Sequence, residues 1–162
     1  MLTLAMTIAL AADPAVSGTF RIDQTNSELQ QIHHAAVDTT LASLPWAIRG
    51  LARSRVERAI GNCSQIGVDL QTQQLTLNCD DEPGRVVDLP ADGVTTTNAD
   101  GESVTTTVYA SDTEMSVTFA TGEGGVTTRY RPSGGRLLVQ KTLFSPRLDE
   151  PVSWEVRYRP VP

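Results

Sequence analysis

The stretch MSVTFATGEGGVTTRYRPSGGRLLVQKTLF, residues 115–144, decides the fold of this chain. It holds three runs in which apolar and polar side chains alternate, and the glycine-containing segments 122–125 and 132–135 separate these runs. Alternation with a period of two is typical of strands that bury one face, and short glycine-rich segments are typical of turns between antiparallel strands. The stretch therefore predicts three consecutive strands of an antiparallel meander.

The same pattern extends from this stretch in both directions. Short runs rich in valine and threonine begin near Ser64, and the final run surrounds Trp154. A separate alternating run, Gly18–Asp23, stands near the N-terminus. The alternation criterion gives about ten strands in all, at regular spacing. This spacing indicates a mainly β protein, an antiparallel up-and-down barrel, with a sandwich as the other arrangement.

A helical insert is expected between the first strand and the others, at about residues 25–61. Thr25-Asn-Ser-Glu28 has the form of a capping box, and apolar residues at helical spacing follow it as far as Leu44. Pro45 disfavours helix at the preceding residue and suits the first turn of a second helix, which Gly61-Asn62 closes. The sequence thus predicts a pair of helices after the first strand.

Length and charge limit the function. The chain has 162 residues, which suits one domain, expected at 18–162. Thirteen basic residues stand against nineteen acidic ones, which gives a net charge of -6. An acidic chain repels phosphate backbones, so no nucleic-acid partner is expected.

The N-terminus has the features of an export signal without its usual basic start. Residues 1–10 are uncharged, mostly apolar and too short to cross a bilayer, and Ala9-Leu10-Ala11 matches a cleavage site. One interpretation is a leader at 1–17 of a secreted or periplasmic protein, and the other is a buried element of a cytoplasmic one. In an oxidising compartment Cys63 and Cys79 are expected to form a disulfide, whereas the alternative is two separate buried thiols.

The order of strand, two helices and uninterrupted meander resembles the fatty-acid-binding protein branch of the calycins, the superfamily that includes lipocalins. The resemblance covers nearly all the chain after the leader and rests on this order, with no specific motif. It implies a small hydrophobic ligand, such as a fatty acid, inside the barrel and the helix pair as a lid. Gly18-Thr-Phe20 stands where calycins often have Gly-x-Trp, and the helical insert is longer than that family's lid. Because that branch is cytosolic, an export signal points to a bacterial or lipocalin-like relative.

Alternation assigns the candidate ligand-binding residues to the inward faces of the strands. An inward apolar set surrounds either a cavity or a solid core, and small Thr and Val side chains suit both. The candidates are Phe20, Met115, Val117, Phe119, Val126, Tyr130, Leu137, Val139, Trp154, Val156 and Tyr158.

Two copies of Arg-Tyr-Arg-Pro, at 129–132 and 157–160, are a second candidate for ligand binding. In the resembled family an Arg-x-Tyr arrangement on the last strands binds a fatty-acid carboxylate from inside the barrel. Here Arg and Tyr are adjacent, so they face opposite sides of a strand. Arg129 or Arg157 would therefore need a bulge to turn inward. The alternative is a pair of solvated strand ends terminated by proline.

The second predicted helix is unusually basic for an acidic protein. Arg49, Arg53, Arg55 and Arg58 lie in a segment whose only acid is Glu57. Such a helix can contact anionic lipid or steer anionic ligands, or its charges can serve only to solvate it.

No motif points to catalysis, a metal or a cofactor. His33 and His34 are adjacent on a predicted helix, so their rings diverge by roughly 100° and chelate one ion poorly. The acidic run 80–82 lacks the alternating oxygen ligands of a calcium loop. We therefore expect a non-enzymatic protein that binds or transports a hydrophobic ligand. The alternative is an extracytoplasmic interaction or structural domain without a small-molecule ligand.

Overall fold

The computed structural model describes residues 16–98 and 100–162, so most of the expected leader lies outside the described residues. Ten strands, two α-helices and one 3-10 turn form in this part of the chain. Their bounds are β1 Gly18–Ile22, α1 Asn26–Ala42, the 3-10 turn Trp46–Ile48, α2 Arg49–Ala59, β2 Gln65–Leu70, β3 Gln74–Cys79, β4 Arg85–Asp88, β5 Val94–Thr97, β6 Ser103–Ala110, β7 Met115–Thr121, β8 Gly124–Ser133, β9 Arg136–Phe144 and β10 Val152–Pro160.

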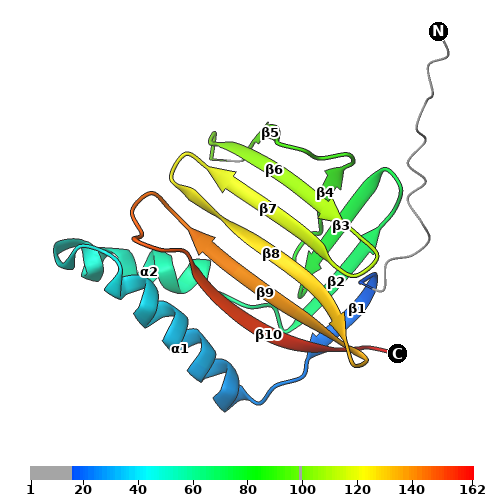
Figure 1. Ribbon diagram of the computed structural model, residues 1–162, viewed down its shortest axis with the longest axis horizontal. Coiled ribbons are helices and arrows are strands. Elements are labelled where there is room, and N and C mark those ends of the chain that lie inside the picture. The colour runs from blue at the N-terminus through cyan, green and yellow to red at the C-terminus, as the bar shows by residue number, and fades with distance from the viewer. Residues whose placement is uncertain (1–15, 99) are drawn as a thin grey trace, which may run out of the picture.

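All ten strands belong to one antiparallel sheet with the order β4-β3-β2-β1-β10-β9-β8-β7-β6-β5. The sheet curls into a half-barrel, as Figure 1 shows. The first and last strands pair with each other, so β4 and β5 are left as the two edges. The expected fold, a mainly β up-and-down barrel of about ten strands with two helices after the first, is confirmed.

The strand register sorts the inner face of β5–β10 into rows, because directly paired residues point to the same side of a sheet. The rim row, nearest the helices, consists of Val94, Thr106, Phe119, Val126, Leu143 and Val152. The middle row consists of Val108, Val117, Thr128, Lys141 and Trp154. The deep row consists of Ala110, Met115, Tyr130, Val139 and Val156.

The deep row belongs to one hydrophobic core. Met115 of β7 and Leu75 of β3 have no exposed surface. The core therefore lies between the two walls of the half-barrel, one of which contains β3 and the other β7. Helix α1 adds Val37 and Leu41 to the same cluster. The lower half of the concave face is therefore filled by side chains.

Helix α1 begins at the predicted capping box. The Thr25 hydroxyl accepts a hydrogen bond from the Glu28 amide at 3.2 Å, and the Glu28 carboxylate accepts one from the Thr25 amide at 2.8 Å. The hydrogen bond from the Thr25 amide, and a second one from the Thr25 hydroxyl to the same carboxylate at 2.9 Å, lower the pKa of Glu28. The helix then runs beside β10 (Figure 1), and α2 follows after the 3-10 turn. Neither helix has the length and hydrophobicity needed to span a membrane.

Candidate ligand-binding site

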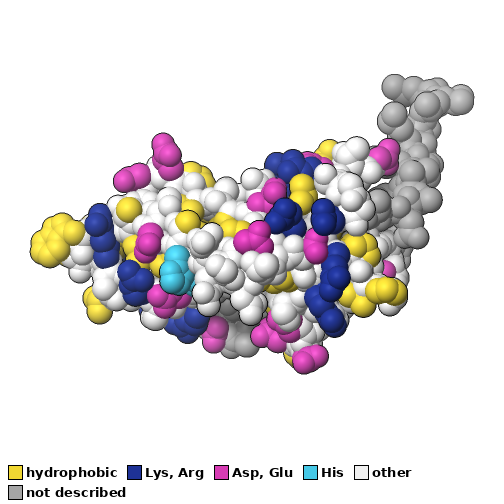
Figure 2. Space-filling model, turned by 90° about the horizontal axis from the view of Figure 1, so that it is seen from below, with side chains coloured by type: hydrophobic (Ala, Val, Ile, Leu, Met, Phe, Trp, Pro, Cys, Tyr) yellow, Lys and Arg dark blue, Asp and Glu magenta, His cyan; other side chains and the backbone are white. Residues whose placement is uncertain are grey.

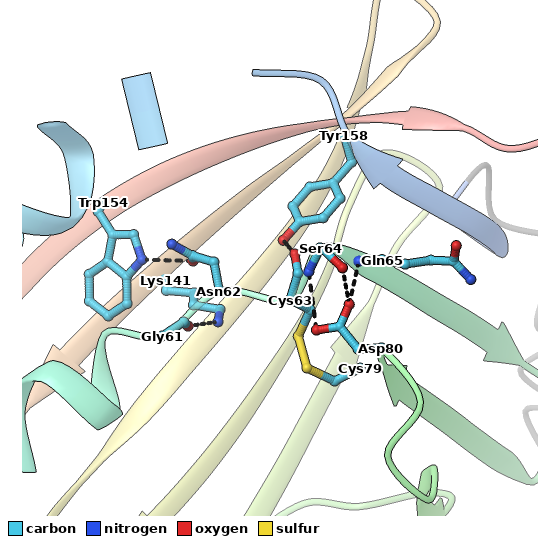
Figure 3. Close-up of a disulfide and its surroundings, with 10 residues drawn as sticks. All are labelled: Gly61, Asn62, Cys63, Ser64, Gln65, Cys79, Asp80, Lys141, Trp154 and Tyr158. Carbon is cyan, nitrogen blue, oxygen red and sulfur yellow. Dashed lines mark hydrogen bonds between the residues drawn. A yellow bond between two sulfur atoms is a disulfide. The ribbon is translucent and has the colours of Figure 1, made fainter. Parts of the chain in front are cut away.

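The linker between α2 and β2, residues 61–64, crosses the inner face of the sheet. Three inward-pointing side chains of β9 and β10 donate hydrogen bonds to it (Figure 3). The bonds are Lys141 Nζ to Gly61 O at 2.7 Å, Trp154 Nε1 to Asn62 Oδ1 at 3.2 Å and Tyr158 OH to Cys63 O at 2.8 Å. The helix pair is thereby tied to the opposite wall at its C-terminal end.

The same linker is fixed to β3 on its other side. Cys63 forms a disulfide with Cys79, the last residue of β3. The Asp80 carboxylate accepts hydrogen bonds from the Ser64 hydroxyl, from the Ser64 amide at 3.2 Å and from the Gln65 amide at 2.9 Å. These bonds, the Ser64 hydroxyl first, hold the pKa of Asp80 below its ordinary value. The linker is thus a cross-brace between the two walls.

A pocket of about 620 Å³, the lid pocket, lies between the helices and the upper ends of β7–β10. Its far wall is the β7–β8 turn and the β9–β10 loop, which Arg147 joins through an ion pair with Glu123. The Ser145 hydroxyl also donates to the Glu123 carbonyl at 2.8 Å. The lining residues are Thr40, Leu44, Ile48, Leu51, Ala52, Arg55, Val56, Ala59, Glu123, Leu143, Ser145, Arg147 and Leu148.

A second pocket of about 360 Å³, the gap pocket, lies where the edge strands β4 and β5 face each other. Arg85 reaches from β4 across this space, and its guanidinium carbon lies 4.2 Å from the centre of the Phe119 ring on β7. A cation over an aromatic face is an attractive contact, so Arg85 joins the edge strand β4 to β7 without a strand ladder. The lining residues are Arg85, Val86, Val87, Asp88, Val94, Thr96, Asn98, Val104, Thr106 and Phe119.

The rim row connects the two pockets. Leu143 lines the lid pocket, and Phe119 lines the gap pocket. Val126 pairs with both residues and is itself only partly buried. Phe119, Val126 and Leu143 thus form an apolar and incompletely covered part of the rim row. This arrangement can hold an elongated apolar molecule under the helices.

The candidate residues from the sequence separate into two groups. Phe119 and Val126 lie on the partly exposed rim row. The other apolar candidates lie together in the buried core: Phe20, Met115, Val117, Tyr130, Leu137, Val139, Trp154, Val156 and Tyr158. Burial raises the pKa of Tyr130 to about 12, and burial, then the neighbouring Tyr130 and Asp80, also raises the pKa of Tyr158.

Neither Arg129 nor Arg157 has the bulge that an inward-pointing arginine would need. The register runs without interruption through both residues, with Arg129 opposite Gln140 and Arg157 opposite Leu138, so both arginines point to the outer face. Glu114 lies 3.8 Å from Arg129, and Glu28 lies 3.4 Å from Arg157. The regular alternation of the strands leaves these guanidinium groups on the solvent side, away from both pockets.

Sequence reasoning missed two parts of the site. Lys141 lies on the inner face although it is charged, and the signal was present, because it falls on the same alternation as Leu137, Val139 and Leu143. The lid pocket is formed by helix and loop residues that are distant in sequence, and no local pattern places these against each other.

The polar groups considered for metal binding do not form a metal site in the described residues. The rings of His33 and His34 lie 6.2 Å apart at their centres and are inclined by 60°. Cys63, Cys79 and Asp80 do lie together, but both sulfur atoms are bonded to each other.

No family model matches the sequence, and no curated protein matches it. The structure is similar to lipid binding protein 8 of Caenorhabditis elegans in its apo form, with a TM-score of 0.53 over 94% of this chain and 100% of that one, at 10% identity. The chain has the calycin-like fold of fatty-acid-binding proteins.

Two further structures share this calycin-like fold. A secretary abundant heat soluble (SAHS) protein from Ramazzottius varieornatus has a TM-score of 0.55 at 11% identity, over 93% of this chain and 98% of that one. The REP1-NXSQ fatty acid transporter has a TM-score of 0.50 at 10% identity, over 90% and 96%. At such low identities the likeness concerns the fold alone.

Proposed function

We propose that this calycin-like protein binds and transports a small hydrophobic ligand, such as a fatty acid, between the helix pair and the rim row. The observation that carries the proposal is the incompletely covered apolar part of the rim row, Phe119, Val126 and Leu143, beside the lid pocket. A volume of about 620 Å³ lies in the range of small-molecule sites. A packed β-barrel without a ligand has no need to leave this row open.

The structural neighbours support the class of ligand. They include a fatty acid transporter and a lipid binding protein, and both align with nearly the whole chain. A carrier needs a pocket and a lid, and it needs no nucleophile or proton-transfer group. We therefore propose a non-catalytic role.

The proposal is tested by ligand capture and by filling the lid pocket. Native mass spectrometry detects a co-purified lipid, and displacement of a fluorescent fatty acid measures affinity. Leu143→Trp places bulk in the lid pocket and should weaken binding at least tenfold. Leu138→Trp is the matched control, because Leu138 lies on the outer face of the same strand.

The result also decides between the two function classes. Absence of binding by the folded wild-type protein would reject the carrier role. The alternative, an extracytoplasmic interaction or structural domain without a small-molecule ligand, would then stand. Equal affinity of Leu143→Trp and Leu138→Trp would place the ligand elsewhere in the molecule.

We further propose that the helical end docks on an anionic lipid surface. Trp46 and Leu51 are 83% and 82% exposed, although both are large apolar residues. Arg53 and Arg55 belong to the same basic helix, and Figure 2 shows Lys and Arg side chains beside hydrophobic ones at that end of the molecule. Interfacial helices combine these two kinds of residue. The local positive charge of α2 supports an anionic partner, in contrast to the net charge of -6 of the whole protein.

Vesicle sedimentation tests this docking. Binding is expected to vesicles that contain phosphatidylserine, to weaken with salt, and to fall with Leu51→Ser. Tyr109→Ser is the matched control, since Tyr109 is an exposed side chain on the outer face of β6. Equal binding to neutral and anionic vesicles, or none, would reject the docking proposal.

We also propose a secreted or periplasmic location, with a cytoplasmic one as the alternative. The disulfide between Cys63 and Cys79 supports it, because such bonds persist mainly in oxidising compartments. Cell fractionation tests the location, and recovery of the protein from the cytoplasm would contradict it.

A further inference from the structure

The protein has a single lysine among its thirteen basic residues, and this lysine lies inside the half-barrel. Lys141 is on the middle row of the inner face, between Thr128 of β8 and Trp154 of β10. It comes two residues before Leu143, which lines the lid pocket. Side chains two residues apart on a strand point to the same face, so Lys141 points to the same side of the sheet as Leu143.

The charge of Lys141 is incompletely compensated. Among residues 16–98 and 100–162 its ammonium group has one hydrogen-bond partner, the Gly61 carbonyl at 2.7 Å, and no ion pair. An ammonium group has three N–H donors. Burial lowers its pKa, which reflects the cost of a charge beside apolar neighbours. A half-buried cation with a single neutral partner favours the arrival of an anion.

We propose that the Lys141 ammonium group binds the carboxylate of an aliphatic acid whose chain lies along the rim row. This inference rests on the proposed carrier function and names the group that would recognise the ligand. The carboxylate would accept N–H donors that the Gly61 carbonyl leaves free, as a charge-assisted hydrogen bond. The apolar chain would extend over Leu143 and Val126 toward the gap pocket.

The other cations near the pockets are less suited to this role. Arg129 and Arg157 point outward. Arg85 lies over the Phe119 ring. Arg55 lines the lid pocket but is exposed on α2, so it would hold a carboxylate at the mouth, in contact with water. Water screens such a contact and weakens it, whereas a buried contact keeps its strength. A carboxylate bound by Lys141 would place the polar end of the ligand inside the half-barrel, whereas a carboxylate bound by Arg55 would place it at the mouth.

Dodecanoate and 1-dodecanol, matched probes that differ in charge, separate these possibilities. Lys141→Met removes the charge at similar length, and we expect it to weaken dodecanoate binding at least tenfold and 1-dodecanol binding less than twofold. Arg129→Met is the matched control, because Arg129 lies on the outer face of the neighbouring strand β8, and it should change both affinities less than twofold. Lys141→Arg keeps a cation and should retain part of the preference for dodecanoate.

A measurement on the wild-type protein makes the test independent of the variants. Because the chain has one lysine, the Nζ resonance of lysine-labelled protein reports on this site alone. We expect dodecanoate to shift this resonance and 1-dodecanol to leave it nearly unchanged. Equal effects of both probes on the resonance, or equal affinities in Lys141→Met, would overturn the role of Lys141 while leaving the carrier function intact. Failure of the wild-type protein to bind either probe would overturn both.

Discussion

Removal of the disulfide tests the cross-brace. In the double variant Cys63→Ser with Cys79→Ser, the folded state keeps the hydrogen bonds from Lys141, Trp154 and Tyr158 to the linker. The main change is in the unfolded chain, which is no longer restricted by the cross-link. The two cysteines are 16 residues apart, and a loop of this length corresponds to about 3 kcal/mol in the chain-entropy model. For a domain of this size such a loss lowers Tm by roughly 10 °C.

Urea denaturation followed by tryptophan fluorescence measures this loss. Trp154 is 6% exposed and reports unfolding, whereas the exposed Trp46 can be replaced by phenylalanine to simplify the signal. The unfolded variant is less compact, so its m-value should rise. Reduction of the wild-type protein should reproduce the stability of the double variant.

A structural control separates the cross-link from the hydrogen bonds. Tyr158→Phe removes the bond to the Cys63 carbonyl but keeps the disulfide, and it should cost about 1 kcal/mol. If the double serine variant and the oxidised wild-type protein were equally stable, or if native protein gave two free thiols, the cross-brace would be refuted.

Three further predictions concern single side chains. The pKa of Tyr130 is raised from 10.0 to about 12 in the folded state. The free energy of unfolding should therefore keep its full value below pH 10 and fall as the pH rises to about 12. In urea titrations Tyr130→Phe should remove about 3 kcal/mol of this fall. Thr25→Ala removes the capping box of α1 and should lower the free energy of unfolding by about 1 kcal/mol. An unchanged melting temperature in thermal unfolding would contradict this. Phe119→Ala should cost less than the ~3–5 kcal/mol of a packed phenylalanine, since its ring is partly exposed. Met115→Ala, at a fully buried position of the same strand, should cost ~2–5 kcal/mol and serves as its comparison in chemical denaturation.

The strands and helices of this protein were predictable because their signals are local. Alternation in the meander reflects one buried face per strand, and each expected turn separates two observed strands. The capping box marked the start of α1 because Thr25 and Glu28 satisfy each other's backbone N–H groups. The second helix differed only at its start, where the structure has a 3-10 turn at Trp46–Ile48. Pro132 and Pro160 lie at strand ends, since β8 ends at Ser133 and β10 ends at Pro160.

The candidate site was only partly predictable. Alternation correctly placed Tyr130 and Trp154 on the inner face, but it could not show whether inward side chains meet or leave space. That depends on the distance between walls that are far apart in sequence. Lys141 was overlooked because a charged residue on an apolar face looks like an exception to the pattern. Its place inside follows from register, whereas its partner, Gly61, follows only from the path of the linker.

The sequence alone determined which segments form strands and helices, their order, and which side of each strand is apolar, because these depend on neighbours a few residues apart. Only the tertiary structure decided that β1 closes between β2 and β10, that the edges β4 and β5 leave a gap, and that the lid pocket lies above a packed core. These features depend on curvature of the sheet and on contacts between segments separated by up to most of the chain. Periodicity carries no information about such distances, so the shape of the site emerges only when the sheet folds upon itself.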